Sequence, residues 1–172
     1  SHSCIKNIIY FYKNLLTFWH NTVILKLFQG EKGRNDLRIT HEADYAIRVT
    51  YCLALAGEKQ CAKDISEVTG VTLRFALKIL RKLTQSGITK SYKGVAGGYE
   101  LNHSPSEISL GAIIECIDGP IAINHCLANE FQCTHMGTQK ECDFHRVFSE
   151  INRSLRDQLC SITMDRFLPP QK

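Results

Sequence analysis

Three cysteines and one histidine in the second half of the chain have a spacing that suits a metal site. Cys126, Cys133, Cys142 and His145 form the pattern C-x6-C-x8-C-x2-H. The segment between them shows neither alternating nor helical periodicity and contains Asn, Gln, Thr, Lys and Glu. Unligated cysteines usually lie in apolar surroundings, whereas thiolates select zinc, copper(I) or iron-sulfur clusters. The pattern therefore favours a metal or cluster, and one disulfide with a spare thiol is the alternative.

The other cysteines and the composition bound the class of protein. The chain has 172 residues, of which 44% are hydrophobic, and eight cysteines. This length is enough for one compact domain, or a small domain with an appendage. Cys52, Cys116 and Cys160 lie in apolar helical patterns, as reduced thiols of cytosolic proteins do. We expect a cytoplasmic protein.

Positive charge is concentrated in one stretch of the chain. The formal net charge is only +4, yet no Asp or Glu occurs between Val71 and Val95. The cations of this stretch are Arg74, Lys78, Arg81, Lys82, Lys90 and Lys93. A solvated helix face usually mixes both signs, so a run of one sign favours a polyanion such as double-stranded DNA. A plain charged surface is the alternative.

The periodicity of residues 40–86 predicts three helices. Apolar residues recur at three- and four-residue spacing in 40–56, where Thr40 is a natural N-cap. A short helix is expected over 61–68, and Thr69-Gly70 forms a turn before a third helix over 72–86. Two short helices joined by a Gly-containing turn indicate a helix-turn-helix.

The third of these helices has the properties of a DNA-recognition helix. At 100° per residue, its buried side is expected to contain Leu73, Ala76, Leu77, Leu80 and Leu83. The opposite arc and the helix start then supply candidate DNA contacts: Thr72, Arg74, Phe75, Lys78, Arg81 and Lys82. Cations bind phosphates and long side chains reach base edges in the major groove.

A basic hairpin and a long helix follow. Residues 88–92 alternate like a strand, 93–98 form a glycine-rich tip and 99–101 return, which predicts a wing that contacts DNA through Lys90 and Lys93. A helix or helical turn is expected over 108–117, and 143–164 has apolar residues at three- and four-residue steps. A long amphipathic helix in a small domain needs a partner surface, so we expect a homodimer that reads a palindromic operator.

Residues 1–36 differ from the rest of the chain. Residues 5–28 are rich in Ile, Leu, Phe and Tyr, but Lys6, Lys13 and His20 recur every seven residues. This pattern predicts an amphipathic helix rather than a membrane span or a signal peptide. A polar, Gly-containing linker follows, so the segment is expected to lie outside the core domain, as an added or upstream-translated piece or as a partner helix.

These features together resemble the Rrf2 family of bacterial winged-helix regulators, which includes IscR, NsrR and RirA. The resemblance covers about residues 37–168. It is carried by Leu37-Arg38-Ile39-Thr40, Asp44-Tyr45-Ala46, Asp64-Ile65-Ser66, Arg81-Lys82-Leu83, Gly94 with Gly97-Gly98-Tyr99, and the three cysteines before the long helix. It implies a mainly α fold: a winged helix-turn-helix domain over 37–103, a connecting helix and cysteine loop over 104–142, and a dimerisation helix over 143–168.

The resemblance also implies a transcription factor controlled by an iron-sulfur cluster on Cys126, Cys133 and Cys142. His145 as fourth ligand implies a two-iron cluster; Asp44 from the partner subunit implies a four-iron cluster. We favour His145 because it is local in sequence. A structural zinc site is an alternative, Cys3His being a common zinc set, and so is a regulator without metal that senses thiol oxidation or a small ligand.

Enzymatic activity is not expected. The chain has no C-x-x-C motif, no recognisable Ser/His/Asp set and no phosphate-binding loop. We therefore expect no catalytic residues, no small-molecule substrate and no membrane partner.

Overall fold

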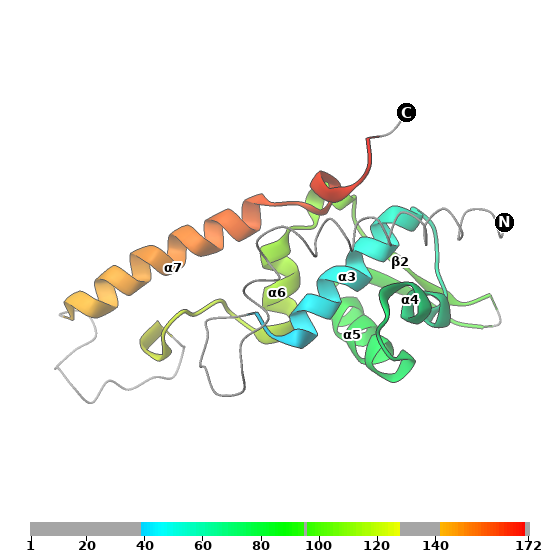
Figure 1. The fold of residues 1–172 in the computed structure, drawn as a ribbon, viewed down its shortest axis with the longest axis horizontal. Coiled ribbons are helices and arrows are strands. Elements are labelled where there is room, and N and C mark those ends of the chain that lie inside the picture. Colours follow the sequence, from blue (N-terminus) through cyan, green and yellow to red (C-terminus); the bar gives the residue numbers. More distant parts are fainter. Residues whose placement is uncertain (1–38, 95, 128–141, 171–172) are drawn as a thin grey trace. The chain divides into compact units, whose positions relative to one another are not determined.

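The computed structural model describes residues 39–94, 96–127 and 142–170. These residues belong to the second of two units into which the chain divides, 1–38 and 39–172. The helix expected in 1–36 and the Cys133 ligand lie outside the described residues. The described part is mainly helical with one small hairpin, as predicted (Figure 1).

Helix α3 (His41–Ala56) lies at the centre of the described unit and packs on α4 (Ala62–Thr69), α5 (Leu73–Gln85) and α6 (Leu110–Asp118). Thr40 caps it as predicted, because its Oγ1 accepts a hydrogen bond from the Ala43 N–H at 3.1 Å. Ala43, Ala46 and Val49 are fully buried. Small residues on α3 thus let the neighbouring helices approach closely.

Helices α4 and α5 form the predicted helix-turn-helix. Cys61 occupies the N-cap of α4, and its Sγ accepts from the Asp64 N–H at 3.4 Å. Gly70 ends α4 in the left-handed region at φ 68°, a conformation that favours glycine. Ser66 Oγ then donates to the Val71 carbonyl at 2.7 Å across the turn. These contacts fix the direction in which α5 leaves the turn.

Strands β1 (Thr89–Tyr92) and β2 (Gly98–Leu101) pair antiparallel, with Thr89 opposite Leu101 and Tyr92 opposite Gly98. The loop between α3 and α4 adds a third strand-like contact. Gln60 and Tyr99 exchange two backbone hydrogen bonds, of 2.9 and 2.8 Å. The wing is therefore attached to the helical core through Gln60 as well as through its own turn.

After the wing, η1 (Pro105–Glu107) leads to α6, and η2 (His125–Leu127) precedes α7 (Asp143–Ser161) and η4 (Met164–Phe167). At Gly111 of α6, an added Cβ would lie 2.5 Å from Cys160 Sγ, so the two helices are in close contact there. Glu115 and Arg156 join them further by an ion pair of 2.6 Å. Helix α7 ends at Ser161 rather than near Met164, whose side chain is instead buried in η4.

Among the described residues, no helix combines the length and the hydropathy that crossing a bilayer requires.

Candidate nucleic-acid interface and cysteine segment

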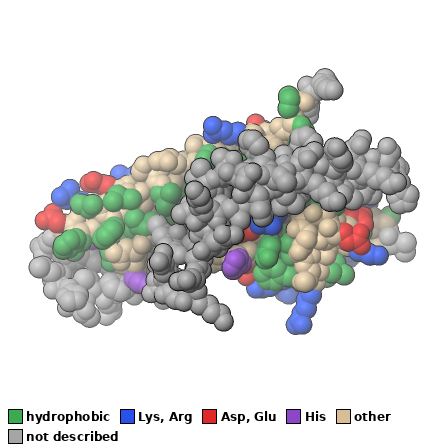
Figure 2. Space-filling view, viewed as in Figure 1, with side chains coloured by type: hydrophobic (Ala, Val, Ile, Leu, Met, Phe, Trp, Pro, Cys, Tyr) green, Lys and Arg blue, Asp and Glu red, His purple; other side chains and the backbone are tan. Residues whose placement is uncertain are grey.

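The exposed face of α5, the second helix of the helix-turn-helix, is the candidate surface for contact with DNA. Arg74, Lys78 and Arg81 are exposed on it, and Thr72 is exposed at the helix start. Arg74 and Arg81 form no ion pair with any other described residue, so their guanidinium groups are free to bind an anion. Figure 2 shows Lys and Arg side chains at the lower edge of the molecule, next to hydrophobic surface.

The buried side of α5 differs from the prediction at three positions. Leu73 and Leu77 were expected in the core but are 43% and 41% exposed. Ile79, which the prediction omitted, is fully buried with Ala76, Leu80 and Leu83. The buried arc of α5 is therefore shifted away from Leu73 and Leu77 and towards Ile79, the side on which α5 packs against α3, α4 and α6. Two leucines remain on the cationic face.

Two of the predicted DNA-binding lysines are held by an acidic residue of α3. Lys78 Nζ donates to Glu42 Oε2 at 2.8 Å, and Lys82 Nζ lies 2.8 Å from Glu42 Oε1. Lys82 also donates to the Ile117 carbonyl at 3.2 Å. Lys82 is therefore bound into the protein, whereas Lys78 keeps a side chain that is 55% exposed.

The Glu42 carboxylate has its pKa lowered by the hydrogen bonds from Lys78 and Lys82. A lowered pKa stabilises the folded state above the carboxyl group's ordinary pKa of 4.5, and this stabilisation is lost as pH falls through the folded-state value. We expect Glu42→Gln to cost about 1 kcal/mol at pH 7, in the range of partly exposed ion pairs. Urea unfolding between pH 3 and pH 7 should show the difference between the two proteins shrinking as pH falls below 4.5; a constant difference would contradict this.

Phe75 is not free on the outer arc as predicted. Its ring is half-buried and packs edge-on against Tyr45 of α3, with centroids 5.7 Å apart. Lys78 Nζ lies 5.5 Å from the same ring centroid. Phe75 therefore supports the position of α5 and of Lys78, and a direct DNA contact by this ring stays a prediction.

The wing carries a cluster of basic and aromatic side chains that includes two residues the sequence reasoning missed. Tyr92 is 44% exposed, and its hydroxyl donates a hydrogen bond to Glu100. This hydrogen bond raises the pKa of Tyr92. Lys59, from the loop before α4, lies 5.4 Å over the Tyr92 ring. Lys90 is 4.0 Å from Glu100, whereas Lys93 is exposed and forms no ion pair with a described residue. Lys59 precedes Gln60, so it reaches Tyr92 through the pairing of Gln60 with Tyr99, a long-range contact that local sequence patterns do not indicate.

Gly98 is required by the contact between the wing and Gln60. A Cβ on Gly98 would lie 2.6 Å from the Gln60 carbonyl oxygen, so the backbone would have to move. We expect Gly98→Ala to cost about 1–3 kcal/mol of stability, as overpacking does, and to weaken DNA binding through a displaced wing. Thermal unfolding and fluorescence anisotropy measure the two effects. Ser91→Ala, at an exposed position of β1, is the control and should change neither.

Two of the three predicted cysteine ligands lie in the described residues. Cys126 in η2 and Cys142 at the start of α7 are half-buried free thiols. His145, on the first turn of α7, is half-buried, and its buried Nδ1 has no hydrogen-bond partner in the described part of the chain. Buried polar atoms without partners are uncommon. Among the described residues, however, no three Cys, His, Asp or Glu side chains come together as a metal site.

The segment before Cys126 is anchored to α7. Asn152 Oδ1 accepts from the Ile123 N–H at 3.0 Å, and its Nδ2 donates to the Ile121 carbonyl at 2.8 Å. Asn152 lies on the same side of α7 as His145, seven residues away. This anchoring packs η2 against α7. Asp44, the alternative ligand, instead forms an ion pair of 2.8 Å with Arg48 on α3.

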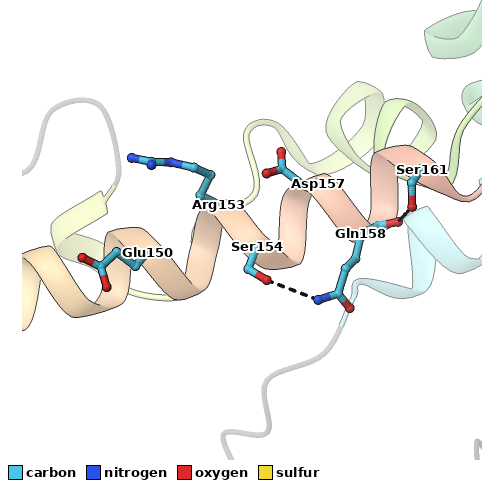
Figure 3. Close-up of a pocket in the computed structure, with 6 residues that line it drawn as sticks. All are labelled: Glu150, Arg153, Ser154, Asp157, Gln158 and Ser161. Carbon is cyan, nitrogen blue, oxygen red and sulfur yellow. Dashed lines mark hydrogen bonds between the residues drawn. The ribbon is translucent and has the colours of Figure 1, made fainter.

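A shallow polar hollow lies along one side of α7. Its lining consists of Glu150, Arg153, Ser154, Asp157, Gln158 and Ser161, all from this helix (Figure 3). Gln158 Nε2 donates to Ser154 Oγ at 3.2 Å across it. A depression lined by one helix does not enclose a small molecule as ligand pockets do.

A helix-turn-helix, a two-stranded wing and cations on the outer face of the second helix define a winged helix-turn-helix protein. The chain belongs to the Rrf2 family: the family's sequence model, described as an iron-dependent transcriptional regulator, matches residues 39–170.

Relatives with sequence similarity are transcriptional regulators and not enzymes, as predicted. The chain is 27% identical over 136 residues to the HTH-type transcriptional regulator IscR of Pectobacterium carotovorum, covering 77% of the chain and 79% of that protein. It is 35% identical over 88 residues to a candidate HTH-type regulator of Mycobacterium tuberculosis, covering 50% of the chain. The chain spans about half, 55%, of the length of that relative.

The fold is shared with solved structures. CymR, described as the global cysteine regulator of B. subtilis, superposes with a TM-score of 0.61 at 21% identity, over 77% of this chain and 96% of that one. This likeness confirms the winged-helix architecture.

Proposed function

We propose that this protein is a DNA-binding transcriptional regulator that works as a homodimer on a palindromic operator. The observation that carries the proposal is the outer face of α5, where Arg74 and Arg81 are exposed without an acidic partner among the described residues. Lys93, which has no acidic partner within the described ranges, supplies a further exposed cation on the wing. Because family members are transcriptional regulators, DNA is the polyanion we propose, in the cytoplasm.

Selection of duplexes from a random-sequence pool, followed by fluorescence anisotropy at several salt concentrations, tests this proposal. We expect sequence-selective binding whose affinity falls steeply with salt, because each neutralised phosphate contributes a log-log slope of about 0.9. Arg81→Ala should reduce that slope by about 1. Arg166→Ala, an exposed arginine of η4, is the matched control. Binding to no duplex, or equal binding by both variants, would refute the interface.

Arg74 and Lys90 should differ in what they recognise. Arg74 lies on the outer face of α5 and is proposed to read a base edge, so Arg74→Ala should cost about 1–3 kcal/mol on the selected duplex and little on random DNA. Lys90 lies on the wing, so its removal should weaken both duplexes evenly. Competition anisotropy with the two DNAs measures the ratio. An equal loss on both duplexes for Arg74→Ala would contradict base reading.

Helix α7 is the proposed dimerisation element. None of its residues is buried in the described chain. Phe144, Val147 and Ile151 are 76%, 44% and 50% exposed and recur at three- and four-residue spacing, which places them along one stripe. Stripes of large apolar residues on a helix are typical of surfaces that are covered by a partner. A second copy of α7 supplies a complementary stripe by symmetry.

For sensing, we propose that Cys126, Cys133, Cys142 and His145 hold an iron-sulfur cluster. The donor set fits, since thiolates and imidazole are cluster ligands, and the buried Nδ1 of His145 has no hydrogen-bond partner among the described residues. Asn152 brings the Cys126 segment to the same helix. The cluster would supply a centre that responds to oxidants, iron or nitric oxide. The ligation depends on Cys133, outside the described residues.

A sensor without iron is the second candidate. The described cysteines are free thiols, and CymR, described as a cysteine regulator, has the same fold. Oxidation of Cys126 or Cys142, or zinc binding at the same side chains, would act on the same segment. Metal analysis of anaerobically purified protein separates the candidates: iron with sulfide, zinc alone, or neither.

A further inference from the structure

Helix α5 exposes two leucines that the core does not use. Leu73 and Leu77 are 43% and 41% exposed, while Ile79, Leu80 and Leu83 are fully buried, so the pair lies at the edge of the arc that faces the core. Leu73 and Leu77 are one turn apart and therefore adjacent on the helix surface. Within the described residues these two side chains leave apolar surface in contact with water.

Cations flank this apolar pair on one side. At 100° per residue, Arg81, Arg74 and Lys78 follow Leu77 around the exposed arc in that order. No acidic residue occurs between Val71 and Val95, and the Glu42 carboxylate of α3 is already paired with Lys78 and Lys82. An occupant of this face must therefore be anionic and yet carry apolar groups that match two leucines.

The major groove of DNA meets both requirements. Its walls are phosphates, and its floor carries one kind of apolar group, the C5 methyl of thymine. A leucine side chain has no hydrogen-bond donor or acceptor, so it can contact this methyl group but cannot pair with the polar edges of guanine, adenine or cytosine.

We propose that Leu73 and Leu77 are specificity-determining residues that select thymine in each operator half-site by contacting its C5 methyl group. Arg74, on the same face, contributes hydrogen bonds to a neighbouring base. The assignment rests on the proposed function as a DNA-binding regulator and adds to it the base that two named side chains recognise.

Thymine-to-deoxyuridine replacement tests the assignment, because it removes the methyl group and keeps the base pair. On the duplex selected by the wild-type protein, single replacements should lower affinity about fourfold at each contacted thymine, the value of one buried methyl group. Replacement in both half-sites should lower it about 15-fold, since a dimer makes the contact twice. Deoxyuridine at thymines outside the protected region is the control for altered DNA shape.

Leu77→Ala identifies the side chain. At the thymine that Leu77 contacts, this variant should bind the thymine and deoxyuridine duplexes with equal affinity. Arg74→Ala should bind both weakly but retain the full difference between them. Because Leu73 and Leu77 are exposed, alanine at either position should leave the melting temperature near the wild-type value. Leu77→Val, which keeps part of the apolar contact, should retain part of the methyl dependence.

Two results overturn the assignment while leaving operator binding intact. One is a selected duplex on which no deoxyuridine replacement changes affinity, as expected if the leucines contact a protein partner. The other is a Leu73→Ala, Leu77→Ala double variant with unchanged methyl dependence. Failure to select any duplex would overturn the proposed function together with this assignment.

Discussion

Replacing Ile151 with glutamate is expected to convert a dimer into monomers. Ile151 lies at the C-terminal end of the exposed apolar stripe of α7 and is 50% exposed in the single chain. A twofold interface repeats each contact, so two isoleucines lose their burial and two carboxylates lose water. Each buried isoleucine contributes about 1.5–3 kcal/mol. The sum predicts a dimer dissociation constant raised by a factor of at least about 100.

Sedimentation velocity across a concentration series measures this change. Arg153→Gln is the matched control, because it lowers the net charge by the same one unit on another side of α7, away from Phe144 and Val147. The control should stay dimeric. Operator affinity of Ile151→Glu should fall as well, because two half-sites bound by one dimer gain affinity from linkage. A wild-type protein that sediments as a monomer, or a variant that stays dimeric, would refute the stripe as the interface.

The local pattern of the sequence was sufficient for most of the elements. Thr40 marks the start of α3 and Gly70 the turn after α4, because caps and left-handed glycines depend on neighbouring residues only. Thr72 precedes α5 as expected but makes no side-chain capping hydrogen bond. The wing was likewise predicted from alternation and glycine content. The pairing of Gln60 with Tyr99, which attaches the wing to the loop before α4, joins residues far apart in sequence and leaves no local pattern.

The candidate DNA interface was predicted in composition but not in detail. A helical wheel assigned Leu73 and Leu77 to the core because hydrophobicity alone cannot distinguish a core residue from an apolar residue at a binding surface. It also treated Lys78 and Lys82 as free, whereas Glu42, more than 30 residues earlier in the chain, holds both. Ion pairs between helices depend on packing, which single-sequence periodicity does not contain.

Anaerobic reconstitution with iron and sulfide is expected to give a protein with visible charge-transfer absorption and bound sulfide, and Cys126→Ser or Cys142→Ser should remove nearly all of it. A thiolate is the soft ligand that iron-sulfur clusters require, and a serine hydroxyl is a poor substitute. Cys116→Ser is the matched control. Cys116 is also a half-buried thiol, but it lies on α6, and its Sγ donates to Ser86 Oγ at 3.1 Å.

The control protein should bind iron and sulfide as the wild type does, and circular dichroism should show that all variants are folded. If Cys126→Ser and Cys142→Ser retain the absorption, the ligands lie elsewhere. If the wild type takes up zinc but no sulfide-containing iron, the site is a zinc site. Either result would leave DNA binding by α5 intact, since the interface shares no residue with the cysteine segment.

The fourth ligand can be assigned with His145→Ala and Asp44→Asn. The His145 Nδ1 atom is buried and has no partner among the residues that the structure describes, whereas the Asp44 carboxylate already has Arg48 at 2.8 Å. A ligand atom with no competing bond loses nothing when it binds iron, so we expect His145→Ala to change the Mössbauer and absorption spectra and Asp44→Asn to leave them unchanged. Spectra of a two-iron cluster should accompany histidine ligation. An altered spectrum in Asp44→Asn alone would assign the ligand to α3 of the partner subunit instead.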